Sequence, residues 1–157
     1  MAVGSVERVR GALVAAGLAA EIKEFDISTR TSADAAAAIG CDVAQIAKSL
    51  VFRGAESGRA ILVITSGANR VDEALLAAEL GEGTAKADAA FVRQATGFAI
   101  GGVAPIGHAT PLTVLIDRDL LGFAEIWAAA GAPNAVFRTT PADLVRLTNG
   151  RVCAIRA

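Results

Sequence analysis

Residues 95–108 read ATGFAIGGVAPIGH, and the rest of the fold can be arranged around this stretch. A regular helix would not hold so many glycines, because each costs roughly 1 kcal/mol relative to alanine. The interleaved apolar residues also distinguish the stretch from a polar surface linker. The pattern predicts backbone that approaches another group closely, with N–H groups free to bind it. The residues that create it are Gly97, Gly101, Gly102, Pro105 and Gly107.

The same stretch has a simpler interpretation as a tight connection between two strands, since glycine and proline are common turn residues. It matches neither the G-x-G-x-x-G pattern of dinucleotide-binding loops nor the GK[ST] ending of phosphate-binding loops. From the residues of this loop alone, both interpretations stay open.

Residues 46–53, IAKSLVFR, predict a strand in which Lys48 occupies an unusual position. Side chains alternate along a strand, so Lys48 shares its face with Ile46, Leu50 and Phe52, and this is the more apolar of the two faces. A lysine there either extends to the edge of the sheet or faces a cavity and binds an anion. We expect Lys48 and the glycine-rich loop to face the same pocket.

The composition is that of a single globular domain covering residues 1–157. The chain is 54% hydrophobic and 20% charged, and no apolar run reaches the length of about 20 residues needed to span a bilayer. We therefore expect a cytoplasmic protein that does not bind membranes. The net charge of −1 gives no overall basic footprint for nucleic acid. Locally basic residues near the end of the chain either contact phosphates or form a solvated face; they are Arg138, Arg146, Arg151 and Arg156.

The cysteines and the histidine do not suggest a metal centre. Cys41 and Cys153 lack CxxC spacing and are too few for a disulfide framework, so neutral thiols are expected. His108 is the sole histidine, and no cluster of acidic residues accompanies it. We expect neither a metal nor another cofactor.

Periodicity and capping residues predict helices that do not alternate regularly with strands, which argues against a doubly wound parallel sheet. The pattern favours an α/β protein of the α+β type, with a mixed, largely antiparallel sheet and helices around it. Helix caps are expected at Ser5, Thr31 and Asp72, and a helix start at Pro141. Helices are predicted at 6–16, 33–39, 72–80, 88–95 and from 140 to 149, with one turn at 119–123. Strands are predicted at 21–27, 46–53, 59–65, 84–87, 98–100, 112–117, 125–129, 135–138 and 151–155.

The order and spacing of IAKSLVF, a helix, ATGFAIGGVAPIGH and TVLID resemble the YbaK-type family. This is the aminoacyl-tRNA deacylase family that also forms the inserted editing domain of bacterial prolyl-tRNA synthetases. The resemblance covers about residues 5–155. Its most specific elements are Lys48 in its strand and the loop G-x-x-x-G-G-x-x-P-x-G from Gly97 to Gly107.

The resemblance implies a curved, barrel-like sheet and hydrolysis of the ester that joins a wrong amino acid to the 3′ end of a tRNA. Lys48 matches the family lysine that helps to hold the terminal adenosine. The loop from Gly101 to Pro105 matches the segment whose backbone lines the aminoacyl pocket. The resemblance therefore implies Lys48, Gly101 and Gly102 as the catalytic residues. The N–H groups of the two glycines would stabilise the oxyanion. Water would be the nucleophile, and the ribose hydroxyl of the tRNA would assist it.

Substrate-binding candidates follow from the same resemblance, and some have a structural alternative. Phe25 falls where some relatives have a tyrosine, and Ala104 where relatives often have a serine, so a hydroxyl is missing at each position. Thr31 and Ser32 lie near the expected pocket mouth or serve only as helix caps. Asp117 matches an acidic position at a strand end, where a cap or turn role is the alternative and a general base the weaker option. The complete set is Phe25, Thr31, Ser32, Val103, Ala104, Pro105 and Asp117.

These residues predict a free-standing hydrolase that deacylates mischarged aminoacyl-tRNA. The expected substrate is tRNA-Pro carrying a small amino acid such as alanine, cysteine, serine or threonine. The alternative is a non-catalytic module that binds the tRNA acceptor end or a nucleotide and docks on a synthetase. The expected partner is the aminoacyl-tRNA 3′ end and not DNA, and the need for a synthetase stays open. His108 is the one histidine that could act as a general base, and its role also stays open.

Overall fold

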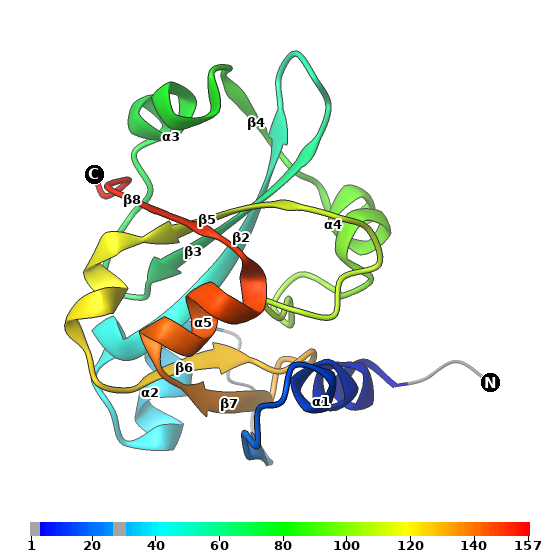
Figure 1. Ribbon diagram of the computed structural model, residues 1–157, viewed down its shortest axis with the longest axis vertical. Helices are drawn as coiled ribbons and strands as arrows, with labels where there is room; N and C mark the ends of the chain where they lie inside the picture. The colour runs from blue at the N-terminus through cyan, green and yellow to red at the C-terminus, as the bar shows by residue number, and fades with distance from the viewer. Residues whose placement is uncertain (1–3, 27–30) are drawn as a thin grey trace.

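The computed structural model describes residues 4–26 and 31–157, in which helices surround one mixed sheet (Figure 1). The α-helices of this part of the chain are α1 (Ser5–Ala15), α2 (Ser32–Ile39), α3 (Glu73–Leu80), α4 (Ala89–Thr96) and α5 (Pro141–Thr148). Two 3-10 helices, η1 and η2, span Val43–Gln45 and Arg118–Gly122. The strands are β1 (Ile22–Glu24), β2 (Ile46–Gly54), β3 (Ala60–Ser66), β4 (Thr84–Lys86), β5 (Thr113–Asp117), β6 (Ile126–Ala129), β7 (Ala135–Thr139) and β8 (Arg151–Cys153).

The strands form one sheet in the order β1-β7-β6-β2-β3-β5-β8, and β4 pairs with the far end of β2. The antiparallel pairs are β1–β7, β6–β7, β2–β3 and β2–β4, whereas β2–β6, β3–β5 and β5–β8 are parallel. Among the described residues the path starts at β1 and ends at β8, so the sheet is not closed there. This mixed sheet with surrounding helices confirms the predicted fold class.

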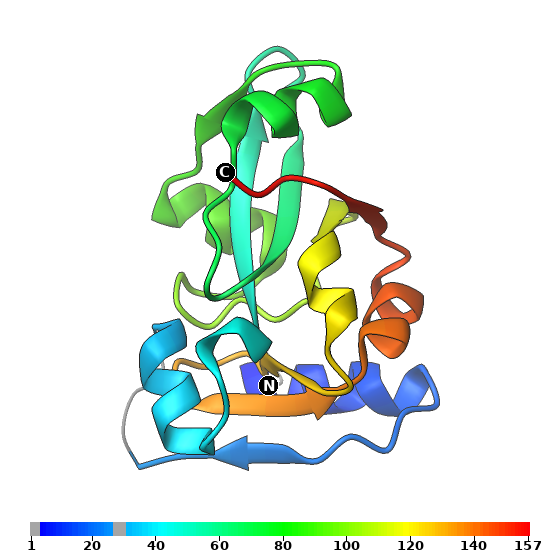
Figure 2. The same cartoon turned by 90° about the vertical axis from the view of Figure 1, so that its left-hand side faces the viewer.

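The β2–β3 hairpin is the longest element of the sheet, and it connects the two ends of the molecule. Figure 2 shows the hairpin upright, with α1, α2, β1 and β7 gathered at its lower end and α3 at its upper end. The side chains of β3 from Ile61 to Ser66 are buried, as its apolar run predicts. Lys48 of β2 lies opposite Thr65 of β3, so both side chains point to the same face of the sheet.

Short polar side chains fix where most helices begin. Thr31 caps α2 by accepting the N–H of Asp34 at 3.0 Å, and Asp72 caps α3 through the N–H groups of Ala74 and Leu75. Asp88 and Thr140 act in the same way on α4 and α5. The capping roles predicted for Thr31 and Asp72 are therefore confirmed.

Several predicted details are wrong. Residues 98–100 do not form a strand, because the Phe98 ring is fully buried in the main core and the chain turns at once, with Gly102 N–H donating to Ala99 O. Ser5 does not cap α1; Gly4 occupies that position without a side-chain hydrogen bond. Strand β1 is shorter than predicted, and Ile27 at the end of the prediction lies outside the described residues.

Gly131 is a position where only glycine fits, because its φ is +98° and a Cβ there would lie 2.6 Å from Ser5 O. We expect Gly131→Ala to lower the free energy of unfolding by about 2–4 kcal/mol, from the left-handed backbone and the clash together. Urea denaturation followed by circular dichroism measures the loss. Gly11→Ala is the matched control, since Gly11 lies in α1 with open space around it; it should stabilise the protein by about 0.5–1 kcal/mol. Equal stabilities of the two variants would contradict this packing.

Candidate functional site

A gap in the sheet beside β2 creates the candidate site. Strand β2 pairs with β6 only at Ile46–Trp127 and Ala47–Ala128, and with β4 only from Phe52 onward. Between these pairings, over residues 48–51, this edge of β2 has no partner strand within the described residues. A cavity of about 80 Å³ lies where β2 and β6 separate.

The cavity is small and mostly apolar. A single water molecule needs about 10–15 Å³ of such space, so the cavity holds a group of only a few non-hydrogen atoms. Lys48 is the single charged side chain among the described residues that line it. The lining consists of Thr31, Ser32, Ala35, Ile46, Ala47, Lys48, Ser49, Gly101, Val103, Trp127, Ala128, Ala129, Ala132, Ala135 and Val136.

Lys48 and the glycine-rich loop contact the same cavity, as predicted from the sequence. Lys48 lines the cavity, as one of the two predictions for it requires, and its binding of an anion stays a prediction. Lys48 is half-buried, and no carboxylate in the described part of the chain forms an ion pair with it. Its positive charge is therefore available to an anionic or carbonyl group of a ligand.

The start of α2 forms another wall of the cavity. Thr31 and Ser32 both line it, but Thr31 alone caps the helix; the predicted cap role of Ser32 is wrong, because Ser32 is the first residue of α2. The N-terminus of a helix carries partial positive charge. This wall therefore adds to the positive potential of Lys48.

The two central glycines of the loop are placed differently. Gly101 lines the cavity with a φ of +92°. Gly102 does not line it; its N–H donates to Ala99 O at 3.0 Å, and a Cβ there would lie 3.0 Å from Ala132. Gly102 thus allows close packing of the loop against Ala132, and its N–H is already engaged. The engaged N–H of Gly102 argues against its predicted oxyanion role, whereas that role stays a prediction for Gly101.

After Val103 the loop turns away from the cavity. Val103 lines it, whereas Ala104 is fully buried in the main core. Pro105 and His108 line a separate surface opening. His108 Nε2 lies 2.8 Å from Ala104 O, and its ring contacts Phe98 edge-on at 6.2 Å between centroids. Burial, assisted by the charge of Arg8, lowers the pKa of His108 despite the opposing effect of this hydrogen bond.

Phe25 lies behind the cavity wall. It packs against a cluster that includes the lining residues Ile46, Trp127 and Val136. The backbone N–H of Phe25 donates to Asn134 O at 2.8 Å, and Asn134 Nδ2 donates back to Phe25 O at 2.9 Å. Phe25 therefore supports the wall, and its contact with a substrate stays a prediction.

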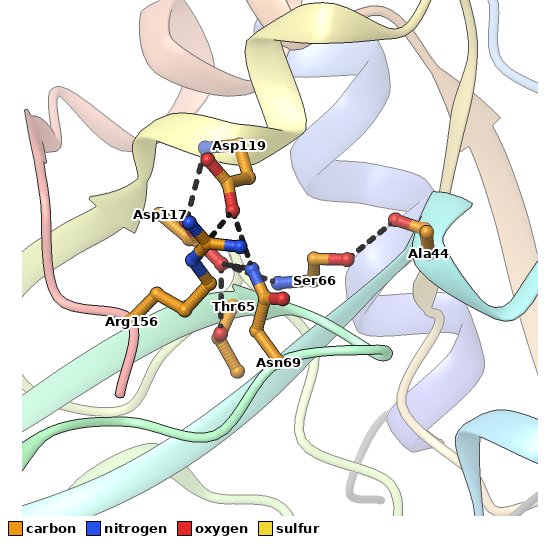
Figure 3. Close-up of polar contacts among 7 residues, drawn as sticks. All are labelled: Ala44, Thr65, Ser66, Asn69, Asp117, Asp119 and Arg156. Atoms are coloured by element: carbon orange, nitrogen blue, oxygen red, sulfur yellow. Dashed lines mark hydrogen bonds and ion pairs between the residues drawn. The ribbon is translucent and has the colours of Figure 1, made fainter.

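Asp117 is not among the lining residues, and its carboxylate is occupied by hydrogen bonds (Figure 3). Oδ2 accepts from Thr65 Oγ1 at 3.0 Å, Ser66 N–H at 3.0 Å and Asn69 Nδ2 at 2.9 Å. Oδ1 accepts the N–H of Asp119 at 3.0 Å. Burial alone would raise the pKa of Asp117, but these four donors together hold it below its ordinary value.

Sequence reasoning missed the wall formed by β6 and the segment after it. Trp127, Ala128, Ala129 and Ala132 line the cavity, but they are apolar and carry no chemical motif. Ser49 was missed as well; its hydroxyl is buried without a hydrogen-bond partner in the described structure. The one available signal was the single tryptophan of the chain beside a run of small residues.

Both cysteines, Cys41 and Cys153, are the free thiols expected from the sequence. Burial is the main cause that raises the pKa of each thiol, assisted by Asp42 at Cys41 and by Glu79 at Cys153. No helix in the described residues has the length and apolar character required to cross a membrane.

The lowered pKa of Asp117 predicts how stability depends on pH. A carboxylate whose pKa is lower in the folded state stabilises the protein fully above the unfolded-state pKa of about 3.9, and this stabilisation is lost as the pH falls through the folded-state value. We expect Asp117→Asn to cost about 1–3 kcal/mol at pH 7, because its amide cannot accept all four hydrogen bonds. The difference from wild type should shrink below pH 4 in urea denaturation. A difference that stays constant from pH 7 to pH 2.5 would contradict the role of the ionised carboxylate.

Comparison with known proteins agrees with this geometry. Residues 27–147 match a family model described as the aminoacyl-tRNA editing domain. The chain is 33% identical over 132 residues to the uncharacterized protein YwhH of Bacillus subtilis, covering 84% of this chain and 83% of that protein. It is also similar to a solved structure described as a candidate trans-editing enzyme for prolyl tRNA synthetase, with 46% identity, a TM-score of 0.93, and coverage of 100% of this chain and 99% of that chain. A further solved structure, of the hypothetical protein APE2540, has 27% identity and a TM-score of 0.89 over 96% of this chain and 99% of that chain. Because the family model spans most of its length, the chain belongs to the aminoacyl-tRNA editing domain family.

Proposed function

We propose that this protein is a free-standing hydrolase that removes a wrong amino acid from aminoacyl-tRNA. The substrate we propose is tRNA-Pro carrying a small amino acid such as alanine, cysteine, serine or threonine. The observation that carries the proposal is a small apolar cavity that contains a single lysine and is bordered by Gly101. Membership of the editing-domain family supports the same class of reaction.

The volume and lining of the cavity suit a small aminoacyl side chain. Space for a few non-hydrogen atoms admits a methyl, hydroxymethyl or thiol group and excludes an aromatic ring. The apolar residues Val103, Ala128 and Val136 would contact that side chain. A pocket of this kind discriminates by about 1–3 kcal/mol for each methylene group that does not fit.

Lys48 would hold the end of the tRNA that carries the ester. Its ammonium group has three donors and a compact charge, which suits a phosphate or an ester carbonyl. The start of α2 at Ser32 lies on the same cavity and favours negative charge there. The substrate would thus be fixed by its charged end and its aminoacyl end at once.

The reaction itself would need few protein groups, because an aminoacyl ester is already activated. A water molecule would add to the ester carbonyl carbon, and the N–H of Gly101 would stabilise the oxyanion that forms. The bond to the ribose oxygen would then break, and that oxygen would take the proton that the attacking water loses. A neighbouring ribose hydroxyl would relay this proton, since Asp117 and His108 are not among the residues that line the cavity.

Substitution of Lys48 tests the proposed substrate contact. We expect Lys48→Met, which keeps an apolar stem of similar length, to lower kcat/KM for a mischarged tRNA-Pro by about 10- to 100-fold. This corresponds to the loss of one hydrogen bond to a charged group. Deacylation of tRNA-Pro charged with alanine, cysteine, serine or threonine gives the rates. Lys86→Met is the matched control, because Lys86 is an exposed lysine on β4 away from the cavity.

Two outcomes would contradict the proposal. If wild-type protein hydrolyses none of these esters but binds the RNA with a steep salt dependence, the chain acts as a non-catalytic binding module. If wild-type protein is active and Lys48→Met is as active as Lys86→Met, the cavity is not the site of the ester.

A further inference from the structure

Asp117 contacts the last two residues of β3 and the turn that follows them; this segment, residues 65–69, is called the 65–69 turn below, and it connects Asp117 to the cavity wall. The carboxylate lies at the end of β5 and is fully buried, with a relative exposure of 1%. Its Oδ2 atom alone accepts hydrogen bonds from three residues of this turn, namely Thr65, Ser66 and Asn69. The 65–69 turn contacts two parts of the cavity wall, the beginning of β2 and the start of α2.

The first connection runs through Thr65 to Lys48. Thr65 is the cross-strand neighbour of Lys48, and their side chains lie on the same face of the sheet. The hydroxyl of Thr65 donates to Asp117 Oδ2 at 3.0 Å. Asp117 therefore fixes the side-chain rotamer of Thr65, the cross-strand neighbour of Lys48.

The second connection runs through the backbone to Ile46, which lines the cavity. Asp117 Oδ2 accepts the N–H of Ser66 at 3.0 Å. The next residue, Gly67, donates its N–H to Ile46 O at 2.8 Å, and Ser66 Oγ donates to Ala44 O at 2.7 Å. The turn thus holds the segment that leads into β2 at two points.

The third connection is a direct contact between Gly67 and the start of α2. A Cβ added at Gly67 would lie 2.7 Å from Ser32 Cβ and 2.5 Å from Val43 O. This close approach means that a small displacement of the turn moves Ser32, which lines the cavity. Interiors packed in this way transmit such displacements.

On the opposite side, exposed groups brace the turn. Asn69 Nδ2 also donates to Asp119 Oδ2 at 2.9 Å, and Arg156 forms an ion pair with the same carboxylate at 3.4 Å (Figure 3). The side chains of Arg156 and Asp119 are 62% and 39% exposed. Because exposed pairs contribute little to stability, the buried Asp117 carboxylate is the stronger restraint on the turn.

We propose that Asp117 is a positioning residue of the cavity: it holds the 65–69 turn and, through it, keeps Lys48, Ile46 and Ser32 in the arrangement that binds the aminoacyl end of the substrate. This inference rests on the proposed function, and it assigns Asp117 neither substrate contact nor proton transfer. A carboxylate suits the role because it is acceptor-only. Asparagine would place an NH₂ group against at least one of the four donors.

Steady-state kinetics of Asp117→Asn separate positioning from simple loss of stability. Partial unfolding lowers the concentration of active enzyme, so it lowers the apparent kcat and leaves KM unchanged. A misplaced cavity wall weakens substrate binding, so we expect KM to rise about tenfold or more, while kcat per folded molecule changes less than about threefold. The substrate is the mischarged tRNA-Pro that wild-type protein hydrolyses. Asp119→Asn is the matched control, because its amide oxygen can still accept from Asn69 Nδ2 and only the exposed ion pair with Arg156 is lost, so it should keep the wild-type KM.

Gly67→Ala provides a second variant in which the Asp117 hydrogen bonds are retained. Its added methyl group would push directly on Ser32 and Val43, so it should raise KM in the same way as Asp117→Asn. Gly122→Ala is the control glycine, since a Cβ there meets open space. An unchanged KM in Gly67→Ala would overturn the positioning role even if Asp117→Asn does not fold.

Hydrogen exchange followed by mass spectrometry gives a readout that does not depend on activity. At equal global stability, adjusted with urea, Asp117→Asn should exchange faster than Asp119→Asn in peptides covering residues 32–49. An unchanged KM in folded Asp117→Asn and in Gly67→Ala, or equal exchange in these peptides, would overturn the positioning role. Failure of wild-type protein to hydrolyse any ester would instead refute the proposed function, and the exchange comparison would still decide whether Asp117 holds the wall.

Discussion

The short pairing between β2 and β6 is the constraint on which the site depends. These strands share only two residue pairs before they separate, and β4 joins β2 only at its far end. The intervening edge of β2 opens a cavity that Gly101 and Val103 border from the loop. The loop can approach β2 this closely because Gly102 has no side chain that would clash with Ala132. A longer β2–β6 ladder would close the gap and remove the cavity.

Charge is distributed unequally around this gap. Lys48 is the single charged side chain among the described lining residues, and the start of α2 adds partial positive charge. The buried Asp117 carboxylate does not line the cavity, and its two oxygens are occupied by four hydrogen-bond donors. The cavity therefore favours a ligand with an electron-rich end and a small apolar body. An aminoacyl ester at the end of a tRNA has both features.

The sequence predicted those parts of the site that depend on unusual residues. A lysine on the apolar face of a strand and a loop rich in glycine pointed to one shared pocket, and the structure brings Lys48 and Gly101 to it. Capping residues such as Thr31 and Asp72 also marked helix starts correctly. Residues without a local signal were missed. Trp127 and Ala128 become a wall only because a parallel pairing between distant strands brings them to β2. The strand predicted at 98–100 is wrong for a similar reason, because the burial of Phe98 depends on tertiary contacts.

The central claim is that the aminoacyl end of the substrate occupies the cavity between β2 and β6. Nuclear magnetic resonance titration with a non-hydrolysable 3′-aminoacylamino-adenosine tests it most directly, because each backbone amide reports on its own surroundings. We expect chemical-shift changes centred on Lys48, Gly101 and Ala129, with small changes at Ala109 and Thr110 beside the separate opening. Changes centred on residues 105–112, or none at millimolar ligand, would contradict it.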